Sequence, residues 1–164
     1  MKDAGKVIEE MTKYFCGDLK RINHLLKVYA LSRTIGQGEN LDDDELELLS
    51  VTAAVHDIGI KLSEQKYNSS AGKYQEIEGP AEAEKLLVNL GYDKEFVRKV
   101  CYLVGHHHTY VNIDSKPYQI LVEADFLVNL CEDNASMQAV KTAEEKIFVT
   151  NTGKKLLKNM YLTP

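Results

Sequence analysis

The chain reads Leu48-Leu49-Ser50-Val51-Thr52-Ala53-Ala54-Val55-His56-Asp57-Ile58-Gly59 where an apolar run meets an adjacent histidine and aspartate. Burial in such a core-like setting is costly for both polar side chains unless a partner compensates for the lost water. A metal ion is a common partner for this combination of groups. About 100° separates neighbouring residues around a helix, so His56 and Asp57 can lean toward one point near its end. The pair alone equally fits a histidine that interacts with the C-terminal end of a helix dipole.

Two further polar residues lie on apolar helix stripes far from this pair. His24 shares a stripe with Val28, four residues on, so its side chain is expected to face inward. Asp125 has Leu121 and Val128 as its neighbours at i−4 and i+3, and no lysine or arginine lies one turn away. A carboxylate on that face loses its water, at a cost of several kcal/mol unless positive charge compensates.

Two histidines and two aspartates form a mixed nitrogen and oxygen donor set. This set suits Mn²⁺, Fe²⁺, Co²⁺, Ni²⁺ or Zn²⁺, and Mg²⁺ less readily. Four protein ligands on a six-coordinate ion leave positions for water and substrate, as a catalytic site requires. Each residue also has a structural alternative: His24 as a hydrogen-bonded core histidine, and Asp125 as the partner of a distant arginine.

Helical patterns run through almost the whole chain, and no alternating strand pattern or internal repeat is convincing. The capping and breaking residues predict these helices: Val7 to Gly17, Asp18 to Ile35, Asp42 to Gly59, Pro80 to Gly91, Asp93 to His106, and Pro117 through Asp125. A polar helix after Asn134 and a short C-terminal segment complete the chain. Residues 61–75 have little periodicity and are predicted to be one long loop. The predicted fold class is all-α.

Composition narrows the classes of protein to which the chain can belong. The length of 164 residues predicts one domain, with 44% hydrophobic and 27% charged residues. A net charge of −5 argues against a broad nucleic-acid surface or an acidic-membrane surface. The apolar stretches are too short for a membrane span, and the N-terminus lacks the apolar region of a secretion signal. Three scattered cysteines are expected to be free, buried thiols, and the expected location is the reducing cytoplasm.

The order of the candidate ligands, together with their surroundings, resembles the HD superfamily of metal-dependent phosphohydrolases. The segments that carry the resemblance are His24-Leu25-Leu26-Lys27-Val28, His56-Asp57-Ile58-Gly59, Glu78-Gly79-Pro80-Ala81-Glu82-Ala83, Val100-Cys101-Tyr102-Leu103-Val104-Gly105-His106-His107 and Glu123-Ala124-Asp125. The resemblance implies a compact bundle of about five core helices around a metal site. Residues 1–164 would form a single HD-type domain, with a core of about 18–130 and appended C-terminal helices over 135–162.

The resemblance also implies a reaction and a role for each candidate residue. A metal-bound hydroxide would attack the phosphorus of a small phosphorylated substrate, such as a nucleotide. The implied metal ligands are His24, His56, Asp57 and Asp125. The catalytic candidates are His106, His107 and Glu78, and the candidates for phosphate binding are Lys61, Lys27 and Arg21. Each of these three cations also fits a solvated surface side chain.

Other parts of the family pattern are missing. Two-metal members carry a further histidine where this chain has Gln75, so one divalent ion is expected rather than two. The Gly-Tyr-Pro segment of cyclic-dinucleotide phosphodiesterases does not follow the paired histidines, so that activity is not expected. A non-catalytic sensor of a phosphorylated ligand and a purely structural ion are the alternatives. The sequence leaves open the metal, the substrate and whether the protein forms homo-oligomers.

Overall fold

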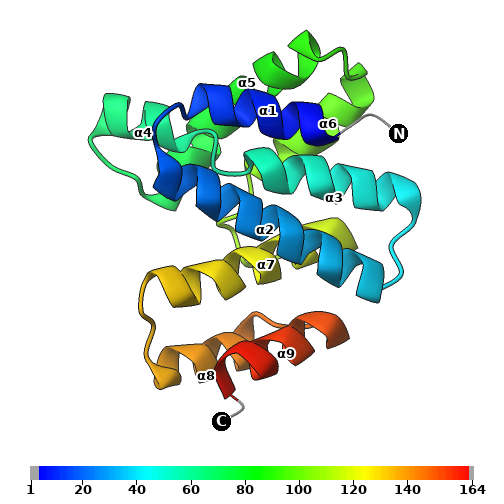
Figure 1. The fold of residues 1–164 in the computed structure, drawn as a ribbon, viewed down its shortest axis with the longest axis vertical. Coiled ribbons are helices and arrows are strands. Elements are labelled where there is room, and N and C mark those ends of the chain that lie inside the picture. Colours follow the sequence, from blue (N-terminus) through cyan, green and yellow to red (C-terminus); the bar gives the residue numbers. More distant parts are fainter. Residues whose placement is uncertain (1–3, 163–164) are drawn as a thin grey trace.

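A computed structural model describes residues 4–162, and all of the regular structure in that range is helical (Figure 1). The elements are α1 (Ala4–Tyr14), α2 (Leu19–Gly38), α3 (Asp43–Val55), α4 (Ile60–Tyr67), α5 (Gly72–Asn89), α6 (Lys94–Val104), α7 (Lys116–Glu132), α8 (Met137–Lys146), α9 (Asn151–Leu157) and the π-helical turn η1 (Lys158–Leu162). The all-α prediction is confirmed.

Side-chain caps account for the start of most of the core helices. Asp18, Asp42, Asp93 and Ser115 each accept a hydrogen bond from the backbone N–H three residues on, at the starts of α2, α3, α6 and α7. The predicted starts of these four helices are therefore correct to within a residue or two. The predicted end of α2 is early, because Gly36 lies inside the helix. A Cβ at Gly36 would lie 3.0–3.2 Å from three leucine side chains, so this glycine allows close packing.

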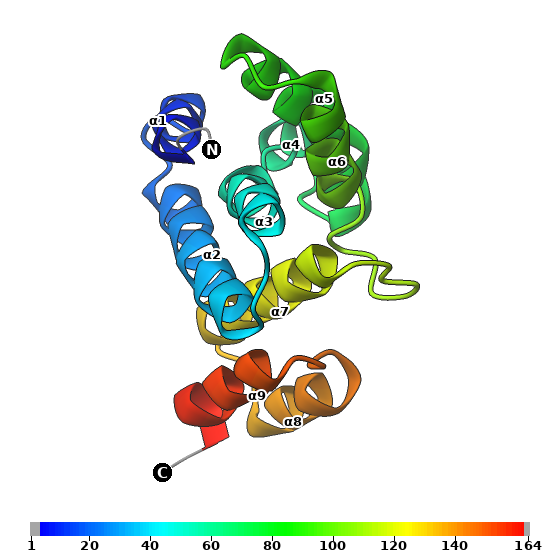
Figure 2. The same cartoon turned by 90° about the vertical axis from the view of Figure 1, so that its right-hand side faces the viewer.

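Five helices form the body of the bundle. Helix α2 packs on α3 and α7, α5 packs on α6, and α3 also contacts α6 and α7 (Figures 1 and 2). Helix α3 is thus surrounded, and its last residues lead into the interior. This arrangement brings the end of α3 close to the middle of α2 and α7.

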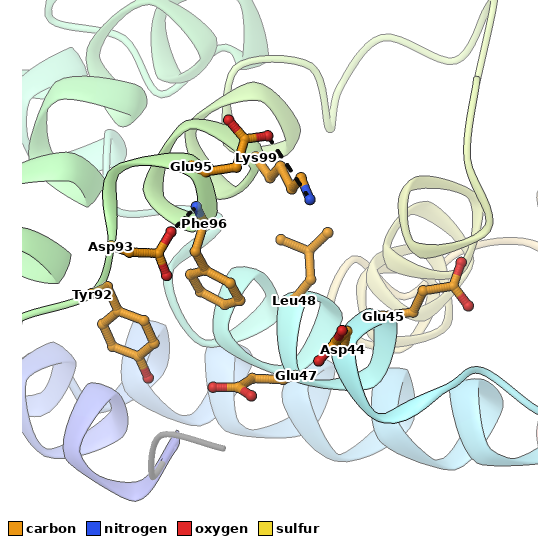
Figure 3. A pocket seen from close by; sticks show the side chains of 9 residues that line it. All are labelled: Asp44, Glu45, Glu47, Leu48, Tyr92, Asp93, Glu95, Phe96 and Lys99. Atoms are coloured by element: carbon orange, nitrogen blue, oxygen red, sulfur yellow. Dashed lines mark hydrogen bonds and ion pairs between the residues drawn. The ribbon is translucent and has the colours of Figure 1, made fainter.

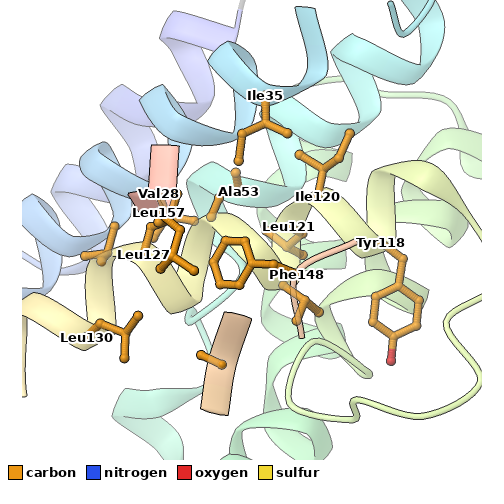
Figure 4. Packing of buried hydrophobic residues seen from close by; sticks show 14 of the residues in the cluster. Val28, Ile35, Ala53, Tyr118, Ile120, Leu121, Leu127, Leu130, Phe148 and Leu157 are labelled. Atoms are coloured by element: carbon orange, nitrogen blue, oxygen red, sulfur yellow. The ribbon is translucent and has the colours of Figure 1, made fainter. Parts of the chain in front are cut away.

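Two large apolar clusters hold the bundle together. One joins α2, α3 and α7 to the C-terminal region, where Phe148, between α8 and α9, and Leu157 of α9 pack with Leu127 (Figure 4). The other joins α1, α3, α5 and α6 around Val55 and Leu87. The C-terminal helices α8 and α9 lie beside α7 at one end of the molecule (Figure 2).

The predicted long loop over 61–75 is wrong. Helix α4 occupies its first part, through Tyr67, and α5 begins at Gly72, which leaves only residues 68–71 as a connection. Stacking of Tyr67 on Tyr74, with ring centroids 4.2 Å apart, joins the two helices. Such aromatic contacts between neighbouring elements produce no apolar periodicity, so the sequence pattern could not indicate these helices.

The predicted helix start at Pro80 is also wrong, because Pro80 lies in the middle of α5. A Cβ at Gly59 would come within 2.5 Å of the Gly79 backbone nitrogen, and one at Gly105 would lie 3.2 Å from the Pro80 ring. Close approach of three chain segments therefore explains the Gly-Pro pair inside the helix.

The composition led to predictions about the cysteines and about membrane-spanning helices. The cysteines are free, but Cys16 and Cys131 are exposed, so the expectation that they are buried is wrong. Both lie near helix ends, where a short apolar stripe does not ensure burial. Within residues 4–162, no helix combines the length and apolar character needed to cross a membrane.

Candidate metal centre

Three helices deliver the four candidate ligands to one point. His24 comes from the first half of α2, His56 and Asp57 follow the last residue of α3, and Asp125 lies in the middle of α7. His56 is completely buried, and Asp125 is only 3% exposed. The inward stripes inferred for His24 and Asp125 are therefore correct.

The two histidines lie within contact distance of each other and of both aspartates. His24 Nε2 is 3.1 Å from Asp125 Oδ1, 3.4 Å from Asp57 Oδ2 and 3.3 Å from His56 Nε2. His56 Nε2 is 3.5 Å from Asp125 Oδ1 and 3.6 Å from Asp57 Oδ1. Ligands at about 2.1 Å from one ion are about 3.0 Å apart in octahedral and about 3.4 Å apart in tetrahedral geometry. The observed spacings match a shared ion.

The hydrogen-bonding state of these atoms also fits a cation. His56 Nδ1 lies 2.9 Å from the Ala53 carbonyl oxygen, so this nitrogen carries the proton and Nε2 presents a lone pair. Asp125 Oδ1 is buried and accepts no hydrogen bond from any residue that the structure describes. Buried lone pairs that face one another require positive charge between them, from a proton or a metal ion.

In the absence of a metal ion, protons supply this charge. Burial would lower the pKa of His56, but the charge of Asp57 and contact with Asp125 raise it to about 9. Burial and the charge of His56 would lower the pKa of His24, but Asp125 and Asp57 together raise it. Burial alone would raise the pKa of Asp125, but the two histidines hold it well below its usual range. A divalent ion would replace these protons.

Two histidines extend the cluster on the other side of Asp57. His107 Nε2 lies 3.1 Å from Asp57 Oδ1, while His107 Nδ1 lies 2.8 Å from the Val104 carbonyl oxygen. His108 Nε2 is 3.9 Å from the same Asp57 oxygen, is buried, and has no hydrogen-bond partner among residues 4–162. Burial and the neighbouring His107 lower the pKa of His108 to about 4, so its ring is neutral near pH 7. The donor atoms of Asp57, His107 and His108 all lie within 4.8 Å of one another.

A cavity of about 420 Å³ opens beside this cluster. Its volume is within the range of sites for small ligands. The residues that line it are Asp18, Lys20, Arg21, His24, Asp57, Ile60, Ser70, Gln75, His108, Asn129, Glu132 and Asp133. Two candidate ligands, His24 and Asp57, thus border a space that a ligand can enter.

A family model for the HD domain matches residues 21–145, which is most of the chain and includes all four candidate ligands. This chain belongs to the HD domain family. A crystal structure of a predicted HD superfamily hydrolase from an uncultured Thermotogales bacterium is similar, with a TM-score of 0.65 and 24% sequence identity. The match covers 95% of this chain and 82% of that protein, and it confirms the fold of an HD domain. No curated protein matches the sequence.

The HD domain places the predicted catalytic residues at different distances from the cluster. His107 lies in it, as described above. The Nδ1 atom of His106 instead contacts the Tyr102 carbonyl oxygen, and its ring packs on Tyr102. The carboxylate of Glu78 accepts hydrogen bonds from Lys66 at 2.6 Å and from the Tyr67 hydroxyl at 2.8 Å. Neither His106 nor Glu78 lines the cavity.

The three predicted phosphate-binding cations also differ in position. Arg21 lines the cavity, where its guanidinium pairs with Asp18 at 2.8 Å and Glu64 at 2.5 Å. Lys61 donates to the Tyr14 carbonyl oxygen at 3.2 Å. Lys27 pairs with Glu132 at 3.2 Å. Of the three, the structure brings Arg21 to the cavity.

Two residues that line the cavity, His108 and Glu132, were not among the predicted site residues. The direction of His108 depends on the turn after α6, which no periodicity describes. That turn is held by Glu76, whose carboxylate accepts from the His108 N–H and the Thr109 hydroxyl, both at 3.0 Å. Glu132 had a usable signal, because it lies two helical turns after Asp125 on α7.

A second cavity of about 420 Å³ lies between the starts of α3 and α6 (Figure 3). Figure 3 shows its acidic side chains around Leu48 and Phe96. Asp44, Glu45 and Asp93 belong to the first turns or caps of these two helices, where negative charge is favourable. Helix capping therefore accounts for this acidic groove.

Proposed function

We propose that this HD domain is a metal-dependent phosphohydrolase that cleaves a phosphoester of a small phosphorylated molecule, such as a nucleotide. The observation that carries the proposal is the convergence of His24, His56, Asp57 and Asp125 beside an open cavity. A structural ion needs no such opening, whereas a catalytic ion needs space for water and substrate.

The four side chains would hold one divalent ion of the Mn, Fe, Co, Ni, Zn or Mg group. When bound, such an ion lowers the pKa of water toward neutrality and neutralises negative charge on phosphate oxygens. The protein keeps His56 and Asp125 away from solvent, so they hold their positions without competition from water.

Residues around the cavity supply the other requirements of phosphoester cleavage. Lys20 and Arg21 provide positive charge on the cavity wall for the phosphate. His107 contacts Asp57 and can orient that carboxylate. His108 lines the cavity with a neutral ring, and its Nε2 has no hydrogen-bond partner among the described residues, so it is a candidate to contact the substrate or a second ion.

The proposal assigns one ion to the site. The group formed by Asp57, His107 and His108 is the place where a second ion would bind. Gln75 lines the same cavity, and its amide nitrogen is used in a 2.8 Å hydrogen bond to the Ser70 carbonyl oxygen. Elemental analysis of the purified protein separates the two cases by the ratio of metal to protein.

The activity test is a panel of phosphorylated metabolites, assayed with the metal found and with added Mn²⁺, Co²⁺ or Ni²⁺. The expected result is release of phosphate or of a phosphomonoester, lost in the Asp57→Asn variant and in EDTA. Metal-dependent binding of a panel member without turnover would instead support a sensor. Loss of the helical circular-dichroism spectrum in EDTA would support a structural ion.

A further inference from the structure

Two carboxylates of helix α7 contact His24. Glu132 is the last residue of α7 and lies seven residues after Asp125, so both project from the same face. Asp125 Oδ1 lies 3.1 Å from His24 Nε2, and Glu132 Oε2 lies 3.0 Å from His24 Nδ1. Each ring nitrogen of His24 therefore faces one carboxylate from the same helix.

His24 differs from the other two buried histidines in its second partner. His56 and His107 direct Nδ1 to main-chain carbonyl oxygens, at Ala53 and Val104. The Nδ1 of His24 meets a carboxylate, which is a stronger acceptor and makes the opposite nitrogen a better electron donor. An ionised carboxylate can only accept, so with a metal ion on Nε2 the single ring proton of His24 would lie on Nδ1, facing Glu132.

The position of Glu132 is itself fixed. Its other oxygen, Oε1, lies 3.2 Å from Lys27 Nζ, one turn after His24 on α2. The Glu132 side chain is 18% exposed, so it is largely shielded from water. Lys27 and His24 thus contact one oxygen each, which holds the carboxylate between them.

We infer that Glu132 is a positioning residue of the metal centre. It holds His24 in the Nδ1–H tautomer, which directs the Nε2 lone pair toward Asp57, His56 and Asp125. Lys27 pairs with Glu132 and does not bind the phosphate of the substrate. This inference rests on the proposed function, because it takes the four side chains as the ligands of a divalent ion.

The first test is calorimetric titration of the metal-free protein with Co²⁺, without any substrate. Glu132→Ala is expected to weaken Co²⁺ binding about 10- to 100-fold, as is typical when the hydrogen-bond partner of a metal-bound histidine is lost. Glu132→Gln keeps an acceptor oxygen but loses the charge, and an intermediate loss is expected. Asp133→Asn is the matched control, because it removes the same charge from the next residue on the cavity wall. Its expected effect is less than about two-fold.

Equal Co²⁺ affinity in Glu132→Ala and Asp133→Asn would overturn the inference, since general electrostatics would then explain any loss. A second measurement needs no metal: the ¹⁵N chemical shifts of the His24 ring, at a pH above its raised pKa. Because Asp125 faces Nε2 in the metal-free protein, the readout is the ratio of the two tautomers, which Glu132→Ala is expected to shift from Nδ1–H toward Nε2–H. An unchanged tautomer ratio in Glu132→Ala would overturn the inference. An Nδ1–H tautomer that depends on Glu132, in a protein that binds no Co²⁺, would support this contact and refute the proposed function.

Discussion

Asp125 lies in the middle of α7 and is only 3% exposed. A carboxylate on an apolar helix face signals a buried partner, and the structure shows its Oδ1 against two histidines from α2 and from the end of α3. Its burial is the reason that the sequence could identify it. The same physical argument identified His24 and the His56-Asp57 pair, so the candidate ligands were predictable from local context.

Substitution of Asp125 tests the ligand set. We expect Asp125→Asn to reduce Co²⁺ affinity by more than about 100-fold, because the amide keeps the shape but removes the charge that balances the ion. Far-UV circular dichroism should show the same helix content as before. Asp114→Asn is the control, since Asp114 accepts from the Tyr102 hydroxyl on an exposed loop. Unchanged affinity in Asp125→Asn would remove this residue from the site.

The stability of the metal-free protein should depend on pH in a defined way. His56 has a pKa of about 9 in the folded protein against 6.5 unfolded, so its stabilising contribution is complete below pH 6.5 and disappears as the pH rises through 9. The lowered pKa of His108, about 4, has the opposite effect, and stability should rise from pH 4 to 6.5.

We therefore expect a maximum in the free energy of unfolding near pH 6.5, measured by urea denaturation in EDTA. Metal-saturated protein should lack the decline above pH 6.5, because a bound ion takes the place of the protons on His24 and His56. A flat profile in EDTA between pH 6.5 and 9 would contradict the protonated state described for His56.

At the scale of elements, the helix starts were predictable, whereas the region between α3 and α6 was not. Caps such as Asp18 and Asp93 are local signals, read from a few residues. Helix α4 and the first turns of α5 depend on contacts between two elements, such as the Tyr67–Tyr74 stack. The direction of His108 depends on the turn that Glu76 holds, so a third element decides it.

Added side-chain volume where α4, α5 and α6 pack closely should lower the free energy of unfolding. A Cβ at Gly79 would lie 2.7 Å from Val104 Cγ1, which is a side-chain atom, whereas a Cβ at Gly59 would meet main-chain atoms of α5 at 2.5–2.8 Å. Gly79→Ala should cost about 1–3 kcal/mol of unfolding free energy, and Val104→Ala should recover about 1 kcal/mol of that cost in the double variant.

The same Val104→Ala change should give no recovery in Gly59→Ala, because the backbone of α5 cannot move away. Urea denaturation of the three single and two double variants measures both couplings. If Val104→Ala recovers the same unfolding free energy in Gly59→Ala as in Gly79→Ala, contact with the Val104 side chain, and not with the α5 backbone, would explain the cost of Gly59→Ala.

For the whole molecule, Glu123 joins the bundle to the C-terminal helices. This completely buried residue of α7 accepts hydrogen bonds from the backbone N–H groups of Val149 and Thr150 at 2.7 and 2.9 Å, and from the Gln119 amide at 2.8 Å. This link to the C-terminal helices was not predictable from the sequence, because its two backbone donors lie 26 and 27 residues away along the chain.

Glu123→Ala should leave these donors unpaired and cost about 3 kcal/mol or more. Hydrogen exchange should become faster over residues 148–162, while Co²⁺ affinity stays within about two-fold of the original protein. If Glu123→Ala speeds exchange in the C-terminal helices and also abolishes Co²⁺ binding, the metal centre depends on those helices. That result would contradict the prediction. Glu145→Gln on the exposed face of α8 provides a control of equal charge change.

The central claim is that four side chains from three helices hold one divalent ion at the edge of a cavity. Anomalous diffraction from crystals grown with Co²⁺ or Mn²⁺ tests it most directly. The account predicts one strong peak about 2.0–2.3 Å from the Nε2 atoms of His24 and His56 and from carboxylate oxygens of Asp57 and Asp125. A map with no peak among these four side chains, or with the ion bound only at another position, would contradict it.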